Sequence, residues 1–456
     1  MIRPSEHSVH LEKGLYDLCR MRIAKDEEFM AQAVNRNFDA VDDALFDEYR
    51  LWQLKKTVKL TREKSSFYRR LFEQAGVSED DIHSLKDIAK LPFTFSSDLS
   101  GTSYSFLCTS QSEVEKPVTF YSSGSTGTKK RIFFSGADIQ KILDFLPRGM
   151  NTVIGREECR CQVFLQNSQG RGIGQILANS LKIFGMQAWT SDLGDSVEDI
   201  IRVTLDNKIN VWFGEAITIF RATRILSRRM DLSKLGMKCI FITMTNIPHS
   251  MVDYLEKTWN CHVSTHYGLT ESGWGLAVDC PDCPGYHYDE LNHYIEIVDP
   301  DTGEVLPYGV QGEVVLTNLA RNCMPLIRYR TGDIATLYPS GCGSHLDALG
   351  HIVRRKEGAY KLNGNDIFPA IFDEILFAHP QLLDYRIFAD NDQLCFEIEA
   401  LDTESFDTDA LAGQLMTLPQ MKGAKRPEIK LLPEGSLRPF CFEKKRILPK
   451  EDTENE

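Results

Sequence analysis

The chain has 456 residues, of which 42% are hydrophobic and 26% charged, and its formal net charge is −13 at pH 7. Its length fits two or three globular domains. The negative charge argues against nucleic acid or an anionic membrane as the main partner, since both favour a basic surface. The sequence contains neither the continuous apolar stretch of a signal peptide nor the roughly 18–20 apolar residues that cross a bilayer. We therefore expect a cytoplasmic protein whose twelve cysteines are mostly thiols.

The first predicted elements are helices. Leu51, Leu54 and Val58 are spaced three and four residues apart, as on one face of a helix. Gly76 is a residue type that ends helices, and it follows this helical region. Farther on, residues 118–335 alternate strand-like apolar runs with helical patterns. This alternation is typical of an α/β core, with strands expected at 163–165, 211–213 and 239–242.

Two later regions have different patterns. From Tyr294 to Leu337, short β runs are separated by turn signals, which predicts an antiparallel sheet or barrel. A domain boundary is expected near residues 355–358, because the following residues have helix and strand patterns of their own. We therefore predict an N-terminal extension, a large domain and a small α+β domain, with the bounds 1–45, 46–354 and 355–456.

A loop rich in hydroxyls and glycine separates two predicted strands, 118–121 and 131–134. A Walker-type phosphate loop has another glycine spacing and leads into a helix, so this loop is not of that type. Its glycines free the backbone, its hydroxyls and amides can close over phosphates, and two lysines supply positive charge. Taken alone, the loop fits a phosphate-binding loop and a flexible polar hairpin equally well. Its residues are Ser122, Ser123, Gly124, Ser125, Thr126, Gly127, Thr128, Lys129 and Lys130.

Two further motifs follow at 265–271 (Thr-His-Tyr-Gly-Leu-Thr-Glu) and 329–333 (Tyr-Arg-Thr-Gly-Asp). In order and separation, the loop and these motifs resemble three segments of the acyl-adenylate-forming (ANL) superfamily, which includes acyl-CoA synthetases, adenylation domains and luciferases. The subfamily that the chain resembles is that of the phenylacetate–CoA ligases. That likeness covers roughly residues 50–450 and is clearest at 61–70, 75–77, 91–94, 296–300, 326–330 and 364–369.

The resemblance implies a fold and a reaction. The expected fold is α/β, with a large N-terminal adenylation domain of α/β subdomains and a small β-barrel-like subdomain, followed by a small mobile α+β domain. In such enzymes a carboxylate attacks the α-phosphorus of ATP, giving acyl-AMP and pyrophosphate, and a thiol then displaces AMP. ATP, Mg²⁺ and coenzyme A are the implied cofactors. Because two anions must meet, catalysis depends on positioning and charge neutralisation.

The resemblance also implies roles for particular residues. The loop Ser122–Lys130 holds the β- and γ-phosphates, Thr270 donates to the α-phosphate and Glu271 binds Mg²⁺. Asp333 suits the ribose, because a carboxylate accepts two hydrogen bonds from a vicinal diol. The remaining nucleotide-binding residues that the resemblance implies are Tyr267, Gly268 and Arg355, and Glu357 matches an acidic hinge residue.

Three segments depart from the resembled pattern. The family carries a catalytic lysine near the C-terminus, but an ungapped match places Glu443 there, so we take the adjacent Lys444 as the catalytic cation, with Lys445 next. The adenine-binding segment corresponds to 242–246, which has an unusual sequence. The expected wall of the acyl pocket, residues 164–174, is polar and rich in glycine, which favours an aryl or short polar acid.

Four residues have the spacing and chemistry of a zinc site. Cys280 and Cys283 form a CxxC pair, His287 follows, and Cys342 lies farther along. Three thiolates and an imidazole complete a tetrahedral Zn²⁺ shell. Some relatives of the phenylacetate–CoA ligases have cysteine and histidine at matching places. Because four protein ligands leave no open position, we expect a structural zinc rather than a catalytic one.

Three functions remain open at the level of sequence. The first is a ligase that joins a small carboxylic acid to coenzyme A. The second is an adenylyltransferase that passes the acyl or AMP group to another acceptor. The third is a non-catalytic nucleotide-binding relative. Homodimers are common in the resembled group, and the sequence itself does not specify an oligomeric state.

Overall fold

The computed structural model describes residues 4–32, 38–121, 129–154, 159–166, 172–244, 246–339, 341–356, 359–390, 392–437 and 447–449. The chain forms two compact units, and each is built from two separate stretches of sequence. The first unit combines residues 1–154 with 266–356, and the second combines 155–265 with 357–456. None of the described helices is both long and apolar enough to cross a membrane.

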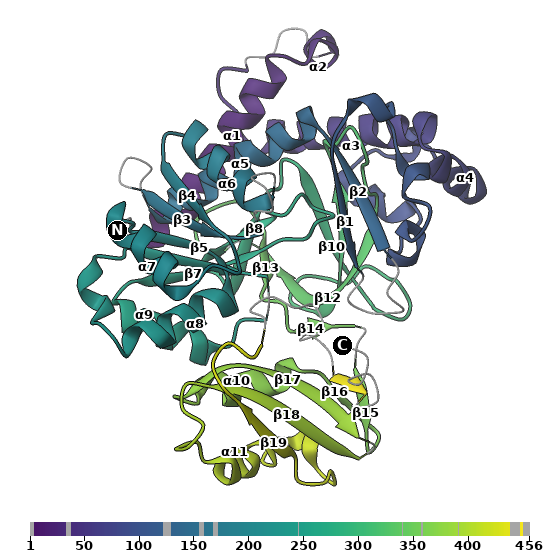
Figure 1. The fold of residues 1–456 in the computed structure, drawn as a ribbon. Helices are drawn as coiled ribbons and strands as arrows, with labels where there is room; N and C mark the ends of the chain where they lie inside the picture. The colour runs from purple at the N-terminus through teal and green to yellow at the C-terminus, as the bar shows by residue number, and fades with distance from the viewer. Residues whose placement is uncertain are drawn as a thin grey trace. The chain divides into compact units, whose positions relative to one another are not determined.

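The helices of the first unit lie before and after a β-hairpin in the chain (Figure 1). The predicted helical region is confirmed. The hydroxyl of Ser65 accepts a hydrogen bond from the Tyr68 amide and so starts a new helix, and Gly76, in a left-handed conformation, ends it. The N-terminal extension is also helical, and its Leu11, Leu15 and Leu18 pack in a core with α5. The helices are α1 (Pro4–Ile23), α2 (Glu27–Gln32), α3 (Asp43–Lys64), α4 (Ser66–Ala75) and α5 (Gly136–Val153).

The sheet of the first unit is antiparallel throughout its described pairings. The order is β10–β11–β12–β13–β9–β8, followed by the last residues of β7, and β14 pairs with β12. The predicted antiparallel region from Tyr294 to Leu337 is thereby confirmed. The strands are β7 (His262–Tyr267), β8 (Ala277–Cys280), β9 (Gly285–Tyr288), β10 (His293–Val298), β11 (Gln311–Asn318), β12 (Tyr329–Tyr338), β13 (Ala348–Gly350) and β14 (Arg354–Arg355).

The predicted strands on either side of the hydroxyl-rich loop are confirmed as a hairpin. β1 (Val114–Tyr121) and β2 (Lys129–Ser135) pair in antiparallel register, with Tyr121 opposite Lys129. Residues 122–128 lie outside the described residues, so the predicted phosphate contacts of Ser122 to Gly127 cannot be compared with the structure. The chain passes directly from β2 into α5, whose first turn is closed by a capping box between Ser135 and Asp138.

The second unit begins with a parallel sheet of order β4–β3–β5–β6–β7. The predicted strands at 163, 211 and 239 are confirmed as β3, β5 and β6. β5 and β6 are buried along their whole length, as strands covered on both faces are. The elements are β3 (Arg160–Phe164), α6 (Ile173–Ile183), β4 (Gln187–Ser191), α7 (Val197–Asp206), β5 (Val211–Glu215), α8 (Ala216–Ser227), β6 (Cys239–Thr243) and α9 (His249–Trp259).

The C-terminal part of this unit has the predicted α+β pattern (Figure 1). Its sheet has the order β19–β18–β17–β20, and it shares one hydrophobic core with α8 and α9. The domain bounds given above remain a prediction. The elements are β15 (Tyr360–Leu362), β16 (Asn365–Ile367), α10 (Ala370–Ala378), β17 (Leu382–Asp390), β18 (Gln393–Ala400), α11 (Thr408–Leu415), β19 (Glu428–Leu432) and β20 (Ile447–Pro449).

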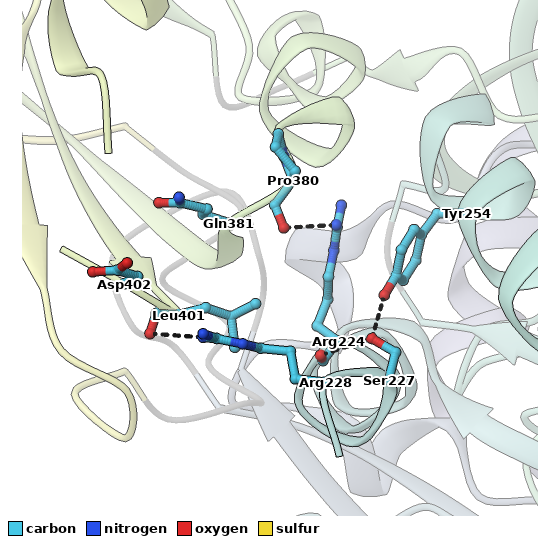
Figure 2. Close-up of a pocket in the computed structure, with 8 residues that line it drawn as sticks. All are labelled: Arg224, Ser227, Arg228, Tyr254, Pro380, Gln381, Leu401 and Asp402. Carbon is cyan, nitrogen blue, oxygen red and sulfur yellow. Dashed lines mark hydrogen bonds between the residues drawn. The ribbon is translucent and has the colours of Figure 1, made fainter. Parts of the chain in front are cut away.

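A polar clasp joins α8 to α10 within the second unit. Arg224 donates hydrogen bonds to the carbonyls of Phe377, His379 and Pro380 at the C-terminal end of α10. Its guanidinium lies over the ring of Tyr254, 3.8 Å from the centroid. Figure 2 shows Arg224 between Pro380 and Tyr254, at the side of a pocket of about 310 Å³. The carbonyls and the helix ends stabilise the buried positive charge.

A buried ion pair fixes the start of β12 in the first unit. Arg328 donates to both carboxylate oxygens of Glu296 on β10, each at 3.0 Å. It also donates to the carbonyls of Ala89 and Leu91, at 2.9 and 2.8 Å, and so anchors the segment before β1. Both side chains are at least nine-tenths buried, so each charge depends on the other for solvation.

We expect the substitution Glu296→Gln to lower the free energy of unfolding by about 3–5 kcal/mol, because it leaves the buried Arg328 without a counter-charge. The measurement is urea unfolding followed by tryptophan fluorescence. Glu198→Gln is the matched control, since it removes the carboxylate of an exposed pair with Arg229 and should leave the free energy of unfolding nearly unchanged. Equal effects of the two substitutions would contradict the prediction.

Candidate functional site

The candidate nucleotide site is centred on the carboxylate of Asp333 in β12. The hydroxyl of Tyr267, at the end of β7, donates to one oxygen at 2.7 Å. The guanidinium of Arg355, in β14, lies 3.0 Å from the other oxygen. The β12–β14 pairing sets Asp333 directly opposite Arg355. Because each oxygen has its own donor, the orientation of the carboxylate is fixed before any ligand arrives.

These contacts also affect the partners of Asp333. Burial, and then the adjacent carboxylate, raise the pKa of Tyr267 well above its ordinary value, so its hydroxyl remains a donor. The carboxylate of Asp333 raises the pKa of Arg355. Asp333 is itself only 5% exposed, so its remaining acceptor capacity is directed to a small area of the surface.

A second carboxylate, that of Glu271, is held in the same way. The hydroxyl of Tyr329, the first residue of β12, donates to Glu271 Oε1 at 2.7 Å. Burial and the carboxylate together raise the pKa of Tyr329 well above its ordinary value. No role for Tyr329 was predicted from the sequence. The signal was present, since a tyrosine opens the quoted 329–333 motif.

The segment from Gly268 to Gly275 forms a tight turn that carries Thr270 and Glu271. The amide of Trp274 donates to the carbonyl of Leu269 at 2.7 Å and closes the turn. A Cβ atom at Gly268 would lie only 1.7 Å from the carbonyl oxygen of Trp274. Only glycine fits at this position, because the backbone opposite cannot move without opening the turn. Thr270 is half-buried at the start of the turn.

Lys130 is the lysine of the predicted phosphate loop whose side chain the structure describes. It lies in β2, is 5% exposed, and its ammonium donates to the hydroxyl of Ser96. The ammonium also lies 6.0 Å from the ring centroid of Phe120 on the paired strand. The structure thus positions a buried positive charge at the exit of the loop. Lys444 and Glu357 lie outside the described residues.

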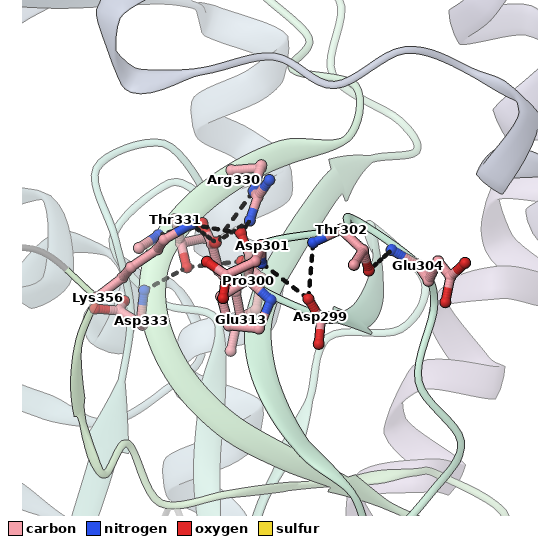
Figure 3. Close-up of polar contacts among 12 residues, drawn as sticks. Asp299, Pro300, Asp301, Thr302, Glu304, Glu313, Arg330, Thr331, Asp333 and Lys356 are labelled. Carbon is pink, nitrogen blue, oxygen red and sulfur yellow. Dashed lines mark hydrogen bonds and ion pairs between the residues drawn. The ribbon is translucent and has the colours of Figure 1, made fainter.

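An ion-pair network holds the strand that carries Asp333 (Figure 3). Glu313 of β11 forms an ion pair with Arg330 of β12 and accepts a hydrogen bond from the amide of Gly332 at 3.2 Å. Arg330 and Lys356 both donate to the carbonyl of Pro300, at 2.6 and 2.5 Å. This network fixes the backbone on either side of Asp333. It also fixes Lys356, the residue that directly follows β14.

The four predicted zinc ligands lie together in the first unit. The ligand atoms of Cys280, Cys283, His287 and Cys342 all lie within 4.8 Å of one another. The pairing of β8 with β9 brings the CxxC pair to His287, and His287 lies opposite Ala348 of β13. His287 Nδ1 lies 3.0 Å from the carbonyl of Asp347, so Nδ1 is the donor and Nε2 faces the sulfurs. This donor set suits a tetrahedral Zn²⁺ ion.

The two unusual segments have structural contacts within the second unit. Asn246, at the end of the predicted adenine segment, donates to Asp373 of α10 at 2.7 Å. Phe164, at the start of the predicted acyl wall, is fully buried and packs edge-on against Trp212, with centroids 5.0 Å apart. Phe164 therefore contributes to the core, and residues 167–171 of the predicted wall lie outside the described residues.

No family model matches the chain. It is similar to phenylacetate-coenzyme A ligase of Pseudomonas putida, with 28% identity over 75% of this chain and 79% of the relative. The ligase of the same name from Escherichia coli K12 is 27% identical over 76% and 80%. That of Thermus thermophilus is 25% identical over 73% and 75%. These likenesses support the expected resemblance to the acyl-adenylate-forming superfamily and, within it, to the phenylacetate–CoA ligases.

Solved structures confirm the predicted α/β fold. A 2-hydroxyisobutyryl-CoA ligase in the postadenylation state, in complex with 2-HIB-AMP, superposes with a TM-score of 0.74 at 19% identity, covering 91% of both chains. The structure of an amide bond synthetase from Marinactinospora thermotolerans gives a TM-score of 0.50 at 16% identity, over 71% of this chain. At these identities the likeness concerns the fold.

Some of the residues predicted from the motifs contact one another in the structure. Tyr267, Asp333 and Arg355 contact one another, and Glu271 contacts the β12 strand that carries Asp333. Gly268 and Thr270 lie in the turn that carries Glu271, and Lys130 lies in β2. The other predicted nucleotide ligands, residues 122–127, lie outside the described residues. The assignment of nucleotide contacts to all these residues therefore remains a prediction.

We expect Gly268→Ala to lower the free energy of unfolding by about 1–3 kcal/mol, because the added methyl group meets the Trp274 carbonyl. Gly413→Ala is the control, since its methyl group meets nothing within 4 Å in helix α11 and alanine favours helix. Thermal unfolding by circular dichroism measures both variants. A Gly268→Ala variant as stable as Gly413→Ala would mean that the turn adapts readily.

Proposed function

We propose that the chain catalyses the ATP-dependent, AMP-forming activation of a carboxylic acid and then forms a thioester with coenzyme A. The single observation that carries this proposal is the fixed Asp333 carboxylate, held by Tyr267 and Arg355 in the motif that relatives share. Relatives named phenylacetate-coenzyme A ligase match three quarters or more of this chain's length in three of four cases. An aryl or short polar acid remains our proposed substrate class.

In the proposed first step, a substrate carboxylate oxygen attacks the α-phosphorus of ATP. A phosphorus–oxygen bond forms to the acid, the bond to the bridging oxygen breaks, and pyrophosphate leaves. Asp333 accepts hydrogen bonds from the ribose hydroxyls, while Thr270 donates to the α-phosphate. Glu271 is suited to hold Mg²⁺, which supplies charge neutralisation to the phosphates. Lys130 and Lys444 are the proposed lysines near the reacting anions.

In the second step, the sulfur of coenzyme A attacks the acyl carbon and AMP leaves with the electrons of the broken carbon–oxygen bond. If the acyl or AMP group passed to an acceptor other than coenzyme A, the protein would be an adenylyltransferase. If the first step did not take place, it would be a non-catalytic nucleotide-binding relative. The oligomeric state stays a prediction. We also propose a cytoplasmic location, because none of the described cysteines forms a disulfide, as a reducing compartment favours.

The deciding experiment is ATP–pyrophosphate exchange over a panel of aryl and short polar acids, followed by thioester detection with coenzyme A. Exchange with at least one acid, and thioester only when coenzyme A is added, is the expected result. Exchange without thioester would favour another acceptor. An absence of exchange with every acid would overturn the enzyme proposal.

We expect Tyr267→Phe to lower kcat/KM for ATP by about tenfold to a hundredfold, because Asp333 loses a charge-assisted donor and its fixed orientation. The measurement is the same exchange assay with ATP varied. Tyr104→Phe is the matched control, since Tyr104 is 54% exposed and contacts Arg131 instead. If Tyr267→Phe retained full kcat/KM, the proposed role of the Tyr267–Asp333 contact would be wrong.

We further propose that Cys280, Cys283, His287 and Cys342 hold a structural Zn²⁺ ion. The donor set and the orientation of His287 support this proposal. Metal analysis of the purified protein should find about one zinc per chain, and Cys283→Ser should lose most of it. Cys261→Ser is the control, because Cys261 is a free thiol of the second unit. Purified protein without zinc, refolded in zinc or not, would refute the site.

A further inference from the structure

Arg321 lies immediately behind the turn that carries Thr270 and Glu271. Its Nη1 donates to the backbone carbonyl of Glu271 at 2.7 Å. A Cβ atom at Gly273, in the same turn, would be 3.4 Å from Arg321 Nη2. Arg321 is 7% exposed, so this contact is made in a desolvated setting. The turn is thus held by a buried charged donor and not only by its own backbone bonds.

Aromatic stacking connects Arg321 to the strand that leaves the hydroxyl-rich loop. Its guanidinium lies 4.8 Å from the ring centroid of Phe134, at the end of β2. Phe134 stacks in turn on Trp274, which closes the turn, with centroids 4.6 Å apart and an interplanar angle of 30°. The three side chains therefore form a continuous stack from β2 to the turn.

The two residues after Arg321 are fixed to the start of α5, which directly follows β2. The carboxylate of Asp138, in the first turn of α5, accepts hydrogen bonds from the amides of Asn322 and Cys323 at 2.7 and 3.0 Å. Asp138 also closes the capping box with Ser135. One buried acid thus joins the junction of β2 and α5 to the segment that presents Arg321.

Arg321 has no carboxylate ion-pair partner among the described residues. Burial lowers its pKa to about 10, so it remains charged at neutral pH. The carboxylate of Asp138 and, less strongly, that of Glu271 stabilise its charge, whereas its donor is directed at the turn. An arginine that served packing alone would be expected to have a closer counter-charge.

We propose that Arg321 is a positioning residue for adenylation, which sets the Thr270–Glu271 turn relative to the junction of β2 and α5. This inference rests on the proposed function. In it, Arg321 touches neither ATP nor the acid. Arg321 acts through the Glu271 carbonyl, the Phe134–Trp274 stack and its own buried charge. The consequence is that the proposed Mg²⁺-binding acid keeps a fixed spacing from strand β2.

The test compares Arg321→Met, Arg321→Lys and Lys141→Met. Methionine keeps apolar contact with Phe134 but removes the donor and the charge, whereas lysine restores the charge. Lys141 is the matched control, because it is a largely buried cation that lines the same small cavity. Its ammonium donates to the carbonyl of Ala320, one residue before Arg321, and not to the turn.

We expect Arg321→Met to lower kcat of ATP–pyrophosphate exchange by about a hundredfold and to raise the Mg²⁺ concentration for half-maximal rate several-fold. Arg321→Lys should recover at least about a tenth of kcat. Lys141→Met should lower the melting temperature to a similar extent without changing the Mg²⁺ dependence. The assay uses the full chain at saturating ATP and acid.

The outcomes separate this inference from the proposed function. Wild-type protein without exchange on any acid contradicts the proposed function itself. Wild-type exchange, with Arg321→Met and Lys141→Met alike in kcat, in Mg²⁺ dependence and in melting temperature, overturns the positioning role and leaves Arg321 as a packing residue. Failure of Arg321→Lys to recover any rate would show that charge alone is insufficient and would place the role on the guanidinium geometry.

Discussion

Two buried tyrosine hydroxyls hold two buried carboxylates in the first unit, and each of the two pairs fixes strand β12 to another segment of that unit. Tyr267 bonds Asp333 and Tyr329 bonds Glu271, each at 2.7 Å. A buried carboxylate without a donor is costly, so each pair must form for the strands to close. The same hydrogen bonds therefore stabilise the folded sheet and orient the two carboxylates of the site.

Strand β12 takes part in both of these pairs. The strand β12 contributes the hydroxyl of Tyr329 to one pair and the carboxylate of Asp333 to the other. A shift of β12 by one residue would reverse the faces of both side chains at once. The network of Glu313, Arg330 and Lys356 resists such a shift, because it ties β12 to its neighbours on both sides of Asp333.

Local patterns predicted much of the fold. The apolar runs of β5 and β6 are long enough to identify buried strands, and the residues 118–134 contain a hairpin whose tip had to be a loop. Leu11, Leu15 and Leu18 also have helical spacing, but the N-terminal extension was assigned no structure from it. Its partners on α5 are more than a hundred residues away, and periodicity does not identify partners.

The candidate site was predicted through motifs rather than through periodicity. The motifs contain Tyr267, Glu271 and Asp333, and the CxxC spacing indicates the zinc ligands. What could not be predicted is which donor each carboxylate takes. The role of Arg321 depends on a contact with a backbone carbonyl fifty residues earlier in the chain, and a sequence carries no local mark of such a contact. Resemblance identifies positions, whereas the pairings require three-dimensional packing.

The interleaving of the two units has a consequence for biosynthesis. Each unit is assembled from two separate stretches of chain, and the second stretch of the first unit ends at Lys356. While the polypeptide is being synthesised, the first 154 residues must wait for residues 266–356, and the second unit must wait for the C-terminal stretch. Such non-local assembly slows folding and leaves apolar surface exposed on nascent chains. Neither unit can be produced as one contiguous fragment, so a truncated gene product should depend on chaperones rather than fold by itself.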